Sequence, residues 1–141
     1  MMHPNVELMP VNEDGIIKEG AFGHICFGSL VSVQMVNSET GVWQDIKTLS
    51  KLAHDKGALF HCDAVQAFPH FQIDVKDLDV DFLSISGHKF GCAPGVGLLY
   101  VKDPHLISPM IHNTQEFGVR GGTENLPYIV AMSKEMARVA E

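Results

Sequence analysis

A lysine sits between an apolar run and a glycine-rich turn in the segment FLSISGHKFGCAPGVGLLYV, residues 82–101. Lys89 follows Ser86, Gly87 and His88, where a strand is expected to leave the core. An amine that is partly shielded from water loses its proton more easily and can form a Schiff base with a carbonyl. The residue types at this strand end therefore indicate covalent chemistry at Lys89.

A second polar group ends the preceding expected strand, in the segment HCDAVQ, residues 61–66. His61 and Asp63 point to the same face of a strand, because side chains alternate between the two faces. Gln66 follows just beyond the strand. Ligands of open α/β sheets bind beyond the carboxyl ends of the strands. We therefore expect one crevice that is lined by Asp63, Gln66, Ser86, His88 and Lys89.

These side chains have complementary chemistry. A carboxylate can keep a pyridine nitrogen protonated, which makes the ring an electron sink. Hydroxyl and imidazole groups beside a glycine turn can hold a phosphate. Taken singly, each residue has a structural interpretation as a cap, a loop group or a solvated amine. Together with a reactive lysine, they favour a site for pyridoxal 5'-phosphate.

Apolar runs separated by glycine and polar turns predict the elements that position these residues. Strands are expected at residues 6–11, 29–37, 58–65, 80–86 and 95–101, a turn at 12–15, and helices at 44–57 and 127–140. Asp45 and Gly57 mark the ends of the first helix. The run at 29–37 is apolar at nearly every position, which is typical of a strand buried on both faces of a parallel sheet.

The order of these elements predicts an α/β fold with a mostly parallel sheet. Two good helices are too few to cover both faces of such a sheet. We therefore expect the chain to be part of a larger domain, with some of the covering structure missing from it.

Composition excludes several classes of protein. The chain has 141 residues, 45% hydrophobic and 19% charged, which is typical of a globular domain. Lys and Arg number 10 against 17 Asp and Glu, and the net charge of -7 disfavours a nucleic-acid partner. The N-terminus does not resemble a signal peptide, and the most apolar window is too short to span a membrane. Three cysteines without a CxxC pair are consistent with a cytoplasmic protein.

The segments SISGHKFGCAPGVGLLYV, HCDAVQ and GVRGGTEN, in this order and spacing, resemble the class V aminotransferase family. Within the family they are most similar to the cysteine desulfurases and the related selenocysteine lyases. The resemblance covers roughly residues 29–140. It implies the three-layer large domain of pyridoxal-phosphate-dependent transferases, with a mostly parallel sheet, of which residues 1–141 would be an incomplete part.

The resemblance also implies a role for each residue of the expected crevice. Lys89 would carry the cofactor as a Schiff base and later move the α-proton of the substrate. Asp63 would pair with the pyridinium nitrogen, and Gln66 would bind the phenolic oxygen of the ring. Ser86 and His88 would hold the phosphate.

The resemblance also implies a contact with a second subunit and site residues that lie outside this sequence. Thr123, in the pattern R-x-G-T-E-N, would reach the phosphate of a neighbouring subunit's cofactor, which implies a homodimer. Ser38 stands where many members have an asparagine near the cofactor, so that contact is not carried over. The resemblance places a ring-stacking histidine, a substrate-binding arginine and the sulfur-accepting cysteine outside these 141 residues.

The activity implied is that of a cysteine desulfurase, which removes sulfur from L-cysteine and leaves alanine and a persulfide. The sulfur would pass to an acceptor protein, for example in iron–sulfur cluster assembly. One alternative is another class V enzyme: a selenocysteine lyase, an aminotransferase or a kynureninase-like hydrolase. The other is a catalytically inactive, truncated or partner-binding remnant. A cysteine loop in flanking sequence would separate the first two, and cofactor capture would test the last.

Overall fold

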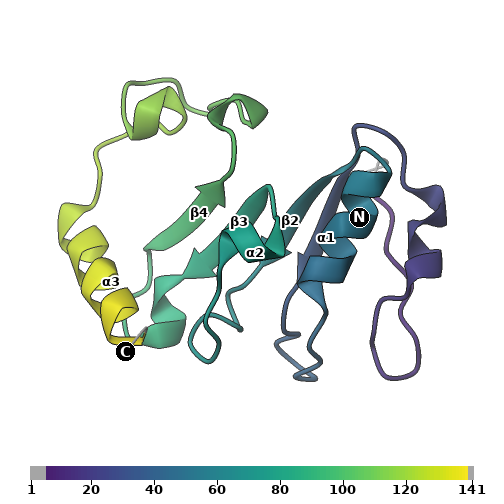
Figure 1. Cartoon of the computed structure of the whole chain (residues 1–141). Helices are drawn as coiled ribbons and strands as arrows, with labels where there is room; N and C mark the ends of the chain where they lie inside the picture. The colour runs from purple at the N-terminus through teal and green to yellow at the C-terminus, as the bar shows by residue number, and fades with distance from the viewer. Residues whose placement is uncertain (1–5, 140–141) are drawn as a thin grey trace.

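The structure is a computed structural model that describes residues 6–139. Its strands form one sheet in the order β1-β2-β3-β4 (Figure 1). They are β1, Leu30–Gln34, β2, Leu59–Asp63, β3, Phe82–Ser86, and β4, Gly97–Val101. β1, β2 and β3 are parallel, and β4 pairs with β3 in the antiparallel direction. The mostly parallel sheet is confirmed, and the carboxyl ends of β1, β2 and β3 lie at one edge of it.

Both expected helices are present. They are α1, Ile46–Asp55, and α3, Leu126–Val139, while residue 140 lies outside the described residues. The Asp45 carboxylate accepts a hydrogen bond from the Thr48 backbone at 3.2 Å and caps α1. Gly57 ends this segment at φ 70°, a left-handed conformation that favours glycine. The short α2, Val75–Leu78, was not expected, because its four residues are too few to show a helical pattern.

The remaining helical segments are short 3-10 helices. These are η1, Glu19–His24, η2, Gly87–Phe90, η3, Pro104–Leu106, and η4, Glu116–Gly118. η2 follows β3 directly and carries the lysine of the expected crevice. Between β4 and α3 the chain makes a wide arc that contains η3 and η4 (Figure 1). No helix in the part of the chain that the structure describes is long and apolar enough to cross a membrane.

The hydrophobic core lies on one face of the sheet. Inward-facing side chains of β1, β2 and β3 alternate with half-buried or exposed ones, except that Phe82 at the start of β3 is also buried. α1 buries Ile46, Leu49 and Ala53 in this core, and Met132 of α3 joins it near Phe90. The helices that bury side chains therefore share one face of the sheet.

The opposite face is called here the open face. It carries Ser32, Gln34, His61, Asp63, Ser84 and Ser86. The expectation that residues 29–37 are buried on both faces is wrong, since Leu30 is 59% exposed and β1 is buried at alternate positions only. The reason is that residues 6–139 supply no helical layer on this face. The expected shortage of covering structure is confirmed, and the third layer of the family fold is not formed by the described residues.

The strand expected at residues 6–11 is also wrong. Only Val11 forms a β-bridge, with Ile17. Pro10 has no backbone N–H to donate, and the segment has no neighbouring strand to pair with. The turn at 12–15 is confirmed, because the Asn12 side chain accepts hydrogen bonds from the backbone of Asp14 and Ile16.

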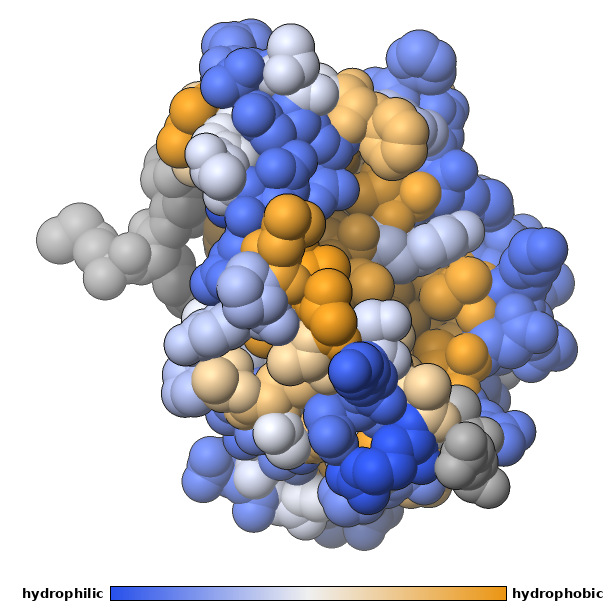
Figure 2. All heavy atoms as spheres, turned by 90° about the vertical axis from the view of Figure 1, so that its left-hand side faces the viewer, coloured by the Kyte–Doolittle hydropathy of each residue, from blue (hydrophilic) through white to orange (hydrophobic). Residues whose placement is uncertain are grey.

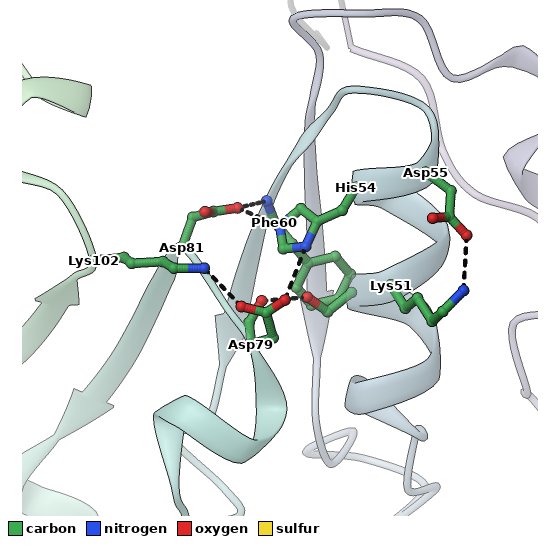
Figure 3. Close-up of polar contacts among 8 residues, drawn as sticks. Lys51, His54, Asp55, Phe60, Asp79, Asp81 and Lys102 are labelled. Atoms are coloured by element: carbon green, nitrogen blue, oxygen red, sulfur yellow. Dashed lines mark hydrogen bonds and ion pairs between the residues drawn. The ribbon is translucent and has the colours of Figure 1, made fainter.

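A polar cluster joins the elements at the edge where β2 and β3 begin (Figure 3). His54 Nε2 lies 2.8 Å from Asp81 Oδ2, which also accepts the Phe60 backbone N–H at 2.8 Å. Lys102 donates to Asp79 at 2.6 Å, and His54 Nδ1 lies 3.5 Å from the other Asp79 oxygen. This cluster ties α1 to β2, β3 and the end of β4. It lies at the opposite end of the strands from the expected crevice.

Candidate active site

Asp63 is the last residue of β2 and lies on the open face. In the strand register it is level with Gln34 of β1 and Ser84 of β3. Its Oδ1 accepts a hydrogen bond from the Val65 backbone at 3.0 Å. This contact holds the half-buried carboxylate at the strand end, where the sequence places it.

Ser86 and His88 lie at the end of the neighbouring strand. Ser86 Oγ and His88 Nδ1 share a hydrogen bond of 2.8 Å. Ser86 is two residues beyond Ser84, and Ser84 is level with Asp63. Strand spacing and rise then put the Cα atoms of Asp63 and Ser86 about 8 Å apart.

The η2 turn presents Lys89 at the same sheet edge. The turn packs closely at Gly87, where a Cβ atom would lie 2.9 Å from Val96 Cγ1 and 3.0 Å from Cys92 Cβ. Gly91 ends the turn at φ 102°. Glycine at these two positions therefore allows the chain to reverse directly after β3 and to expose the lysine.

An aromatic contact brings the turn that carries Gln66 next to the turn that carries Lys89. The rings of Phe68 and Phe90 meet edge to face with centroids 4.9 Å apart. Gln66 is half-buried and Lys89 is exposed. We expected the Lys89 amine to be partly shielded from water. This expectation is wrong, because Lys89 is exposed in the structure of residues 6–139. The open face has no covering layer there, so Lys89 remains in solvent.

Two further residues of the resemblance come from other segments of the chain. Thr123 is exposed in the loop before α3, where Arg120 Nη1 donates to the Gly122 carbonyl at 2.9 Å. Among the described hydrogen bonds its side chain has none to the other site residues, so its role stays a prediction. Ser38 lies in the turn after β1, which Asn37 orders by accepting two backbone hydrogen bonds at 3.0 Å.

The sequence did not predict one feature of the open face. His61 Nδ1 lies 2.8 Å from Ser32 Oγ, and His61 Nε2 lies 2.8 Å from Ser84 Oγ. Burial lowers the pKa of His61, while the nearby charge of Asp63 partly opposes that shift. A serine inside each of two apolar strands was the available signal, together with the histidine that faces the same side as Asp63.

The three cysteines differ in their burial and in their place relative to this site. Cys62 is fully buried on the core side of β2, and burial raises the pKa of its thiol to about 12. Cys26 is exposed but far along the chain from the crevice, before β1. Cys92 is half-buried beneath the η2 turn. The thiol of Cys62 is therefore protonated near neutral pH and is a poor nucleophile.

Known proteins share both the sequence and the fold. The family model described as Aminotransferase class-V matches residues 2–138. The cysteine desulfurase IscS of Ehrlichia chaffeensis is 47% identical over 116 residues, which cover 79% of this chain and 28% of that protein. The IscS of Clostridium botulinum is 40% identical over 139 residues, covering 96% of this chain and 35% of that protein.

Solved structures agree with these sequence relatives. The NifS-like protein of Rickettsia africae has a TM-score of 0.89 at 36% identity, and the match covers 96% of this chain and 39% of that one. SspA in complex with cysteine has a TM-score of 0.81 at 37% identity, covering 88% of this chain and 37% of that one. The chain spans about a third of the length of the curated relatives that it matches.

Proposed function

Because this chain belongs to the class V aminotransferase family, we propose that it forms the cofactor-binding part of a cysteine desulfurase. Class V aminotransferases and cysteine desulfurases depend on pyridoxal phosphate. The observation that carries the proposal is the meeting of polar side chains at the carboxyl ends of two parallel strands. Asp63 ends β2, and the Ser86-Gly87-His88-Lys89 segment ends β3 beside it.

The donors and acceptors at this edge fit pyridoxal phosphate. They comprise a carboxylate at one strand end, a hydroxyl–imidazole pair at the next, an amide in one turn and an exposed amine in the other. When bound, the cofactor supplies an aldehyde that the amine can capture and a ring that accepts electrons.

Each side chain then has a distinct task. Lys89 would hold the cofactor through Nζ and carry a proton to or from the substrate's α-carbon. The Asp63 carboxylate would keep a proton on the ring nitrogen, because an anion beside that nitrogen favours its charged form. The Gln66 amide would donate to the phenolic oxygen. Ser86 and His88 would hold the phosphate at the end of β3.

The proposed substrate is L-cysteine. Relatives at 40% and 47% identity are named cysteine desulfurases, and a structurally similar protein is described in complex with cysteine. The reaction would transfer the sulfur atom of cysteine to a thiolate, which yields alanine and a persulfide. The thiolate would come from a part of the protein other than the three cysteines of this chain.

The complete protein would work with partners. Thr123 would contribute to the cofactor phosphate of a second subunit, which makes the proposed assembly a homodimer. A sulfur-acceptor protein would take the persulfide sulfur. The three free cysteines support a reducing compartment, and we propose the cytoplasm.

The first experiment is cofactor capture by the purified chain. The chain is mixed with pyridoxal phosphate, freed of the excess, and examined by visible absorption. Reduction with borohydride and peptide mass spectrometry then locate the modified residue. The parent and the Lys134→Ala variant, which loses an exposed amine on α3, are expected to show the band and a modified Lys89.

The Lys89→Ala variant is expected to lose both signals. A band that persists in Lys89→Ala, or a modification spread over several lysines, would contradict the proposal. The absence of a band in the parent would favour the alternative in which this chain is a remnant or needs a partner to bind the cofactor.

A further inference from the structure

A continuous hydrogen-bonded row crosses three strands on the open face. It runs from Ser32 on β1 through the imidazole of His61 on β2 to Ser84 on β3, with 2.8 Å at each step. The row is formed only by side chains, so it adds to the backbone ladders of the sheet. It joins residues that are 29 and 23 positions apart in the sequence.

The row ends beside the carboxylate of the proposed site. In the register, Ser32 is level with His61, whereas Ser84 is level with Asp63. His61 is two residues before Asp63 on β2, and its imidazole therefore reaches diagonally to Ser84, the β3 residue that is level with Asp63. His61 and Asp63 also share a face of β2 at a spacing of about 7 Å.

The two ring nitrogens of His61 match their partners. A neutral imidazole has one N–H donor and one acceptor, and a serine hydroxyl can serve either. Both bonds of the row can therefore form at once when the ring is neutral. Burial, which lowers the pKa of His61, favours this neutral state.

The His61 imidazole is half-buried, so it loses hydration that an apolar side chain at this position would not lose. Its hydrogen bonds offset this loss, and one of them links it to Ser84, which is level with Asp63. We propose that His61 is a positioning residue that acts through Ser84 to fix the place of the Asp63 carboxylate, which would pair with the ring nitrogen of the cofactor. The inference rests on the proposed function, since Asp63 is the group it serves.

The test compares variants of the purified chain in which Asp residues carry a ¹³C label at the carboxyl carbon. Asp63→Asn identifies the Asp63 resonance. His61→Leu removes both bonds of the row, Ser84→Ala removes the bond next to Asp63, and His61→Gln keeps a donor and an acceptor. Ser50→Ala is the matched control, because the buried Ser50 of α1 donates a part-buried hydrogen bond to the Asp79 carbonyl at 2.6 Å.

His61→Leu and Ser84→Ala are expected to move the Asp63 carboxyl resonance and to weaken capture of pyridoxal phosphate about fivefold, the value of one hydrogen bond. His61→Gln is expected to restore both readouts. Ser50→Ala is expected to lower the melting temperature and to leave both unchanged. If His61→Leu does not fold, the Ser84→Ala variant alone tests whether the row positions the Asp63 carboxylate.

The inference is overturned if His61→Leu and Ser84→Ala lower only the melting temperature, as Ser50→Ala does. The row would then serve the sheet alone. If neither the parent nor any variant captures pyridoxal phosphate, the proposed function is wrong for this chain. The Asp63 resonance is measured without cofactor, so it still decides whether the row positions the carboxylate.

Discussion

At the scale of single residues, protonation states on the open face follow from burial and neighbouring charge. His61 is half-buried between two serines, so its charged form loses hydration without gaining a direct anionic partner. The Asp63 carboxylate lies two residues away and only partly compensates. Lys89, by contrast, projects into solvent from the η2 turn. Burial therefore favours a neutral His61 between the two serines, while Lys89 is exposed to solvent.

The lowered pKa of His61 predicts a pH dependence of stability. Below pH 6.5, the ordinary pKa of histidine, His61 of the unfolded chain binds a proton. His61 of the folded chain binds it only at lower pH. The unfolded state then binds more protons, so the free energy of unfolding falls as pH falls through this window. Urea unfolding at several pH values should show a shallower fall for His61→Gln. His70→Gln, at an exposed histidine, is the control, and equal slopes in parent and His61→Gln would refute the prediction.

At the scale of elements, the polar cluster at the starts of β2 and β3 positions α1 on the sheet. Asp81 is 6% exposed, and its Oδ2 serves both the His54 ring and the Phe60 backbone N–H. The Lys51–Asp55 pair on α1 is exposed and lies within a single helix (Figure 3). The His54–Asp81 contact at 2.8 Å and the Lys51–Asp55 ion pair at 3.1 Å therefore differ in what depends on them.

We expect Asp81→Ala to lower the free energy of unfolding by about 3 kcal/mol, because it leaves a buried N–H without an acceptor. Lys51→Ala, which breaks the exposed pair, should cause a much smaller loss. Urea unfolding of both variants measures the difference. Similar losses in the two variants would show that Asp81 is not a structural link between α1 and the sheet.

At the scale of the whole molecule, apolar surface remains uncovered at the β4 side of the sheet. β4 is an edge strand with Leu98 and Leu99 40% and 52% exposed, and Ile129 and Val130 of α3 are also exposed. Figure 2 shows hydrophobic atoms gathered across the middle of the face seen from this side. An edge strand with apolar side chains offers a template for another chain.

The purified chain should therefore associate as its concentration rises. Leu99→Glu places a charge on the edge strand and should raise the concentration of half-association about tenfold. Sedimentation velocity over a concentration series measures it. Leu8→Glu removes an exposed leucine outside the sheet and should leave association unchanged. Equal behaviour of parent and Leu99→Glu would exclude β4 as the contact.

Several elements were predictable because their signals are local. Apolar runs and glycines identified the strands that became β1 to β4, and Asp45 and Gly57 identified the ends of α1. The prediction of a strand at residues 6–11 was wrong, because a β-strand needs a neighbouring strand to pair with, which an apolar run cannot specify. The prediction that β1 is buried on both faces was wrong for a related reason. It depends on a helical layer over the open face, which residues 6–139 do not form.

The sequence by itself determined which residue types stand at the strand ends of the proposed site. Its order and spacing placed Asp63 at one strand end and Ser86, His88 and Lys89 at the next, because strand periodicity and turn glycines act over a few residues. Only the tertiary structure decided that Ser84 lies level with Asp63, that His61 joins three strands, and that Lys89 is exposed. Strand register and coverage come from contacts between residues far apart in the chain, which local patterns do not encode.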